Sequence, residues 1–190
     1  MFKDLVLKNR SYRRFNQKEI ASGELHELID LARLTPSGRN AQPLKYFLVS
    51  TREGCEKMFD HLAWAGYLQD WEGPVDDERP TAYVIILGDT AISTTFGIDP
   101  GIAAQTLLLG AVEKGMGGCI LGSIQREEIR SEFRLPARYE ILYVIALGYP
   151  VEQVAIETVK EDGDVKYWRD VQQVHHVPKR ALAELIVGEM

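Results

Sequence analysis

The sequence is poor in cysteine, in long apolar runs and in positive charge. Its 190 residues include two cysteines, Cys55 and Cys119, and no CxxC pair, which excludes a disulfide framework and favours a reducing compartment. No stretch approaches the roughly 18 uncharged apolar residues of a membrane helix. Acidic residues (28) outnumber Lys and Arg (22), whereas nucleic-acid-binding domains are usually basic. We therefore expect a cytoplasmic protein with neither a membrane nor a nucleic-acid partner.

Several motifs of catalysis are also absent. The sequence has no GxxxxGK[ST] phosphate loop, no HExxH zinc helix, and no GxSxG elbow around Ser123. The glycine-rich run 115–122 fails as a dinucleotide fingerprint, because Ile120 breaks the spacing and a helix precedes it. His175 and His176 are adjacent and lack a third ligand, so we expect no metal site.

The length and composition of the sequence, with 45% apolar and 26% charged residues, indicate one globular domain over residues 1–190. Apolar spacing predicts helices at 2–9, 22–35, 52–63, 99–114 and 125–133, and a last helix starting at Pro178. Ser22 and Asp99 are expected to cap their helices. Apolar runs predict strands at 45–50, 81–88 and 141–147. This order indicates an α/β or α+β sandwich around a small central sheet. Residues 64–80 read as a loop or flap, and residues 151–190 as an arm that packs on something, such as a second subunit.

Two basic stretches are candidates for phosphate binding. Near the end of the first helix, Arg10, Ser11, Arg13 and Arg14 offer guanidinium forks and a hydroxyl. Such residues equally suit a solvated helix end. Lys179 and Arg180 follow Pro178 at the expected start of the last helix, where cations are unfavourable unless an anion is present.

Two further stretches suit a flat, polar ligand. The segment 36–43 (PSGRNAQP) offers short polar side chains on a backbone stiffened by prolines, although it is equally a helix-to-strand turn. Glycines in 117–122 allow a ring to approach the backbone, or simply make a tight connection. Trp64, Tyr67 and Trp71 either stack on a substrate or form core under the flap.

Taken together, these stretches resemble the flavin-dependent nitroreductase family. The resemblance runs from RSYRRF through PSGRNAQP, DPGIAAQTLLLGAVEKGMGGCILGS and LGYP to HHVPKR. It implies an α+β fold, a nitroreductase-like α/β/α sandwich with a mostly antiparallel sheet, in an intertwined homodimer with FMN at the interface. It also implies which residues bind FMN: Arg10, Ser11, Arg13, Lys179 and Arg180 at the phosphate, Pro36, Ser37, Gly38, Asn40 and Gln42 (in relatives from the partner subunit) along the ribityl chain and flavin, and Leu121 and Gly122 near flavin N5.

The implied activity is an NAD(P)H-dependent FMN oxidoreductase. Hydride from NADH or NADPH would pass through flavin N5 to a quinone or nitroaromatic in a ping-pong scheme, with no catalytic side chain required. Asn9 stands where many relatives carry another arginine, and the chain is shorter than the better-known members. The alternatives are a related flavin enzyme with one dedicated substrate, of the dehalogenase, flavin-destroying or peptide-oxidising kind, and a non-enzymatic FMN-binding protein.

Overall fold

The computed structural model describes all residues 1–190, and the chain divides into two compact units. The first unit comprises Met1–Trp64 and Gly73–Val151, and the second comprises Ala65–Glu72 and Glu152–Met190. The prediction of a single domain with a C-terminal arm stays a prediction.

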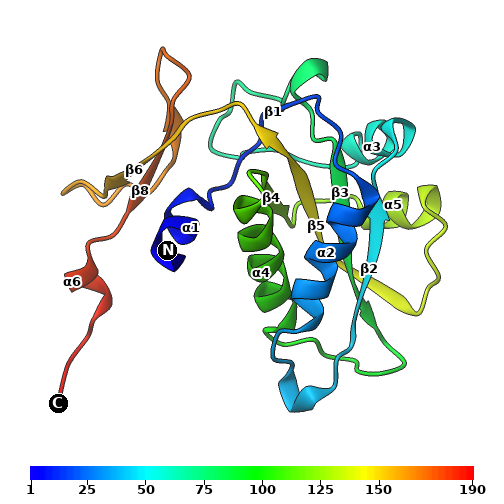
Figure 1. The fold of residues 1–190 in the computed structure, drawn as a ribbon. Helices are drawn as coiled ribbons and strands as arrows, with labels where there is room; N and C mark the ends of the chain where they lie inside the picture. The colour runs from blue at the N-terminus through cyan, green and yellow to red at the C-terminus, as the bar shows by residue number, and fades with distance from the viewer. The chain divides into compact units, whose positions relative to one another are not determined.

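The first unit is built on a five-stranded sheet with helices on both faces (Figure 1). Its helices are α1 (Phe2–Lys8), α2 (Ser22–Arg33), η1 (Gly38–Asn40), α3 (Arg52–Phe59), η2 (Asp76–Glu78), α4 (Asp99–Glu113) and α5 (Arg126–Glu132). Its strands are β1 (Phe15–Asn16), β2 (Leu44–Val49), β3 (Ala82–Asp89), β4 (Gly117–Leu121) and β5 (Tyr139–Pro150). The order is β1-β5-β3-β2, with β4 also paired to β5, and every pair is antiparallel.

The core lies between the sheet and the adjacent helices α2 and α4 (Figure 1). Alternation along β3 sends Val84 and Ile86 toward these helices, where they join Leu28 of α2 and Leu107 of α4, all fully buried. The run TAYVIILG is apolar throughout because β3 lies between two strands and is covered on both faces. The α+β fold with an antiparallel sheet is therefore confirmed.

The second unit contains a small three-stranded sheet. It consists of β6 (Val154–Thr158), β8 (His175–Lys179) and β7 (Trp168–Arg169), with β8 in the middle, and is followed by the short helix α6 (Leu182–Leu185). The flap residues 65–72 belong to this unit: the Tyr67 and Tyr167 rings lie 4.9 Å apart, and the Arg169 guanidinium lies 4.2 Å from the Trp71 ring centre. The chain contains no helix long and apolar enough to cross a membrane.

Some predicted boundaries were wrong. The predicted helix from Pro178 is instead the end of strand β8, and only four residues, Leu182–Leu185, are helical. Proline is tolerated there because β7 pairs only with His175 and His176, so β8 has an unpaired edge at Pro178. Ser22 and Asp99 are first helical residues rather than caps, since Ala21 and Ile98 hold the cap positions. The helix predicted at 52–63 ends at Phe59.

Candidate functional site

The structure brings the first basic stretch against the glycine-rich strand. Ser11 forms a bridge with Gly118 of β4, and the Tyr12 amide donates to the Gly118 carbonyl at 3.1 Å. Among the strands, β4 pairs only with β5, so its other edge offers backbone groups to a ligand beyond this bridge. Two stretches about a hundred residues apart in the sequence are thus one local surface.

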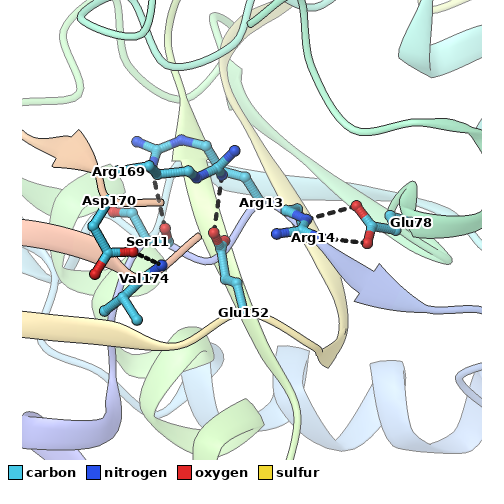
Figure 2. Close-up of polar contacts among 8 residues, drawn as sticks. All are labelled: Ser11, Arg13, Arg14, Glu78, Glu152, Arg169, Asp170 and Val174. Atoms are coloured by element: carbon cyan, nitrogen blue, oxygen red, sulfur yellow. Dashed lines mark hydrogen bonds and ion pairs between the residues drawn. The ribbon is translucent and has the colours of Figure 1, made fainter. Parts of the chain in front are cut away.

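The arginines of this surface point in different directions. Arg13 donates to the carbonyl of Ser11 at 3.2 Å, whereas Arg14 makes two hydrogen bonds of 2.6 Å to the carboxylate of Glu78 (Figure 2). Arg10 donates from Nη2 to the Val6 carbonyl at 2.7 Å, and its Nε is buried without a hydrogen-bond partner. A guanidinium with an unused buried donor suits an anion that accepts several hydrogen bonds, such as a phosphate.

Two glycines of β4, Gly117 and Gly118, are required by close packing within the chain. A Cβ on Gly117 would lie 2.6 Å from the Tyr12 ring, and one on Gly118 would lie 2.0 Å from the Ala146 carbonyl oxygen. These two glycines are therefore required by packing within the chain and not by an approaching ring. Gly122 is different, because it is exposed and its nearest neighbour would be the Tyr143 ring at 3.7 Å. Leu121 has a buried side chain and offers a ligand only its backbone.

The loop 36–42 lies at the start of α4. Ser37 Oγ donates to Asp99 at 2.6 Å, and Pro36, Gly38, Asn40 and Gln42 are exposed. A cavity of about 230 Å³ adjoins the loop, lined by polar residues that include Ser37, Gln42, Tyr46 and Asp99. Burial, and to a lesser extent Asp99, raises the pKa of Tyr46, so its hydroxyl stays a donor at neutral pH.

The loop and the basic stretch do not form one site within a single chain. The loop contacts Asp99, the first residue of α4, whereas Gly118 lies beside Leu108, roughly 14 Å further along the helix at about 1.5 Å per residue. This separation is compatible with two half-sites that a second copy of the chain would complete.

Lys179 and Arg180, the last two residues predicted to bind the phosphate, belong to the second unit. Lys179 ends β8 and is exposed, and Arg180 is half-exposed with a 3.2 Å ion pair to Glu184. Next to them, β7 is fixed to the start of the unit by an ion pair of 3.0 Å between Arg169 and Glu152, and the Val174 amide donates to Asp170 (Figure 2). The argument that these cations sit on a helix N-terminus was wrong, because β8 is a strand.

His176 is held between two carboxylates. Its ring nitrogens lie 2.5 Å from Glu157 and 3.2 Å from Asp170, and its ring stacks on Trp168 at 4.1 Å. Hydrogen bonding to Asp170 is the largest influence and raises the pKa of His176; burial opposes it, and hydrogen bonding to Glu157 adds to the rise. No group of three or more His, Cys, Asp or Glu side chains is placed to hold a metal ion.

The three aromatic residues considered for substrate stacking, Trp64, Tyr67 and Trp71, have different environments in the structure. Trp64 is buried and stacks on Phe59, and Gly73 packs against its ring, so it is core. Tyr67 is half-exposed, and Trp71 lies under Arg169. Sequence reasoning missed Asp99 as a partner of the loop, because nothing in the sequence shows that a helix start and a loop sixty residues earlier meet.

A larger hollow of about 610 Å³ opens elsewhere on the first unit and contains none of the predicted residues. Five carboxylates line it against two arginines: Glu19, Glu56, Asp60, Asp76 and Asp77 face Arg52 and Arg79. Carboxylates repel a phosphate, so size is a poor guide here, and the chemistry of the donor groups favours the smaller surfaces for an anionic cofactor.

Comparison with known proteins gives a consistent result. The model described as "Nitroreductase family" matches residues 6–149. A solved structure from Parabacteroides distasonis, named "Putative NADH dehydrogenase/NAD(P)H nitroreductase", is 27% identical, covers 92% of this chain and 96% of its own, and has a TM-score of 0.67. An FMN-dependent nitroreductase from Clostridium difficile R20291 is 22% identical with a TM-score of 0.64, covering 78% of this chain and 87% of its own. An iodotyrosine deiodinase from Thermotoga neapolitana is 24% identical over an alignment 170 positions long, which covers 79% of this chain and 89% of that protein.

Proposed function

Since the chain belongs to the nitroreductase family, whose members are oxidoreductases, we propose that it is an NAD(P)H-dependent FMN oxidoreductase that reduces an electron-poor acceptor of the quinone or nitroaromatic kind. The observation that carries the proposal is the surface where Arg10 and Arg13 lie beside the open edge of β4. It joins two guanidinium groups, of which Arg10 has a buried Nε without a hydrogen-bond partner, to backbone groups that can contact a flat ring.

FMN, when bound, supplies the redox chemistry, and the chain supplies binding and orientation. Arg10, Ser11 and Arg13 would hold the phosphate, with Lys179 and Arg180 from the C-terminal segment. The polar loop of Pro36, Ser37, Gly38, Asn40 and Gln42, in which all but the half-exposed Ser37 are exposed, would bind the ribityl chain and the ring edge. The backbone at Leu121 and Gly122 would face the reactive side of the flavin. No side chain is assigned as an acid or a base.

We further propose that the sites form in a homodimer, in which residues 151–190 pack on the partner. The separation of the loop from the basic stretch along α4 supports this, since each would then belong to a different half-site. Leu182, Leu185, Ile186 and Val187 are exposed, and apolar side chains in such number call for a covering surface. Light scattering should give a dimer at micromolar concentration, and a monomer that keeps its flavin would contradict the proposal.

The test of the activity is a half-reaction. The purified protein should carry FMN, and donor and acceptor should use one pocket in turn, giving parallel double-reciprocal lines. After treatment with NADH or NADPH and removal of the nucleotide, menadione should still be reduced at the turnover rate. Intersecting lines, or reaction with menadione only while nucleotide is present, would contradict the scheme.

The similarity to an iodotyrosine deiodinase favours one second candidate, a flavin enzyme dedicated to a halogenated phenol. The two candidates differ in substrate range. A broad set of reduced quinones and nitroaromatics supports the first, whereas halide release from iodotyrosine with little activity on menadione supports the second.

A further inference from the structure

One buried carboxylate joins the two ends of the polar loop. Asp99 is 7% exposed. Its Oδ2 accepts a hydrogen bond from Ser37 Oγ at 2.6 Å, and its Oδ1 accepts one from the Gly38 amide at 3.0 Å. Ser37 Oγ in turn accepts from the Gln42 amide at 2.9 Å. The contacts therefore run from α4 through Ser37 to the far end of the loop.

The loop needs such a constraint because its backbone is strained. Arg39, Asn40 and Gln42 have φ values of 54°, 54° and 52°, in the left-handed region that costs free energy for residues with side chains. Strained backbone of this kind persists only where its surroundings determine it. The other hydrogen bonds of residues 37–42 stay within the loop, such as Gln42 Nε2 to the Asn40 carbonyl, so Asp99 supplies the hydrogen bonds from outside.

We propose that Asp99 is a positioning residue, which acts through Ser37 to hold Asn40 and Gln42 in the arrangement that binds the flavin. This inference rests on the proposed FMN function. The loop presents Asn40 and Gln42 to solvent, and a loop fixed before binding loses less conformational entropy when the ligand arrives.

The carboxylate of Asp99 determines which atoms donate and which accept in these hydrogen bonds. A carboxylate only accepts, so Ser37 must donate its proton to Asp99 and keeps its lone pairs for the Gln42 amide. An amide at position 99 has one acceptor and one donor group. In Asp99→Asn it can satisfy the Gly38 amide only by turning its NH₂ toward Ser37, which leaves the Ser37 proton without this acceptor.

The test uses FMN binding and hydrogen exchange, and not activity alone. FMN affinity of the flavin-free protein is measured by quenching of flavin fluorescence for wild type, Asp99→Asn, Ser37→Ala and the double variant. We expect each single variant to raise the FMN Kd at least about tenfold, and the double variant to be no worse than the stronger single one, because both remove the same link. In the absence of FMN, exchange in a peptide covering 36–43 should accelerate, with a peptide covering 82–89 unchanged.

Asp89→Asn is the matched control. Asp89 is also fully buried, and its carboxylate accepts from Arg138 and the Ala91 amide instead of the loop. This variant should lower the melting temperature while the FMN Kd stays within about threefold of wild type.

The possible outcomes distinguish failure of the positioning role of Asp99 from failure of the proposed FMN function. Wild type that binds FMN, with Asp99→Asn and Ser37→Ala binding equally well, overturns the positioning role and leaves the FMN assignment intact. Wild type that binds no FMN overturns the proposed function itself. If Asp99→Asn does not fold, Ser37→Ala decides through hydrogen exchange without FMN, since Ser37 is itself a proposed flavin contact: faster exchange in the peptide covering 36–43 supports the positioning role, and unchanged exchange overturns it.

Discussion

The neighbouring residues Arg13 and Arg14 provide a sharp test of the phosphate site. Both are arginines in one short segment, yet Arg14 is bidentate to Glu78 whereas Arg13 donates to the Ser11 carbonyl (Figure 2). Replacement of either by alanine removes one positive charge from the same stretch. A non-specific electrostatic effect would therefore be equal for the two, and a specific phosphate contact would not.

The magnitudes follow from the contacts. A hydrogen bond to a charged group contributes about 1.5–3 kcal/mol, so Arg13→Ala should weaken FMN roughly ten- to a hundredfold. Lys179→Ala should weaken FMN by a similar factor, because the proposal places its ammonium group at the same phosphate. Arg14→Ala leaves Glu78, whose side chain is 23% exposed, without its bidentate partner, which costs about 1–3 kcal/mol of stability. For a chain of this size that is a fall in melting temperature of roughly 3–10 °C.

The assays are FMN titration by fluorescence quenching and thermal unfolding of the flavin-free protein. The expected pattern is a large loss of affinity for Arg13→Ala with less than about a threefold change for Arg14→Ala, and a clear loss of stability for Arg14→Ala. Equal and small losses of affinity in both variants would refute the reasoning, and would mean that the arginines form a solvated surface only.

Three further predictions concern other parts of the chain. Burial raises the pKa of Cys55 to about 12, so its thiol should not react with a disulfide reagent at pH 8 in the folded protein and should react once urea unfolds it; rapid labelling of the native protein would contradict this. The folded pKa of His176 lies above its ordinary 6.5. The contribution of protonated His176 to stability is therefore complete below pH 6.5 and is lost as the pH rises through the raised value. Urea unfolding at several pH values should show this loss in wild type and not in His176→Gln, and identical pH profiles would exclude the effect. Gly118→Ala would place a Cβ 2.0 Å from a backbone oxygen and should fail to fold, whereas the exposed Gly122→Ala should fold; a stable Gly118→Ala would show that β4 is packed differently.

The sequence predicted the core elements well where the pattern was strong. TAYVIILG appears as a strand buried on both faces because its apolar run is short and unbroken, and α2 appears as a helix because its apolar stripe follows the helical period. The prediction of a final helix from Pro178 was wrong because no local pattern determines the structure of that segment. The five-residue segment HHVPK forms a strand through pairing with Val154–Thr158, twenty residues earlier, and local propensity carries no information on such a partner.

The candidate site was predictable in its residue types and not in its arrangement. Clustered arginines and a polar loop are visible in the sequence, but nothing in the sequence shows that Arg14 pairs with Glu78. Asp99 was predicted as a helix cap, the commonest local role of aspartate there, but its carboxylate binds Ser37 and Gly38. The glycine-rich run was consistent with the approach of a ring or with a tight connection, and the neighbours Tyr12 and Ala146 explain Gly117 and Gly118 by packing.

The central claim is that this chain holds FMN and passes electrons from a nicotinamide donor through it. The most direct test is the visible spectrum of the purified protein under anaerobic conditions, before and after NADH or NADPH is added. The account predicts a yellow protein with the absorbance of bound FMN, which one equivalent of nucleotide bleaches and menadione restores. A colourless protein that takes up no FMN on incubation, or a yellow one that neither nucleotide bleaches, would contradict it.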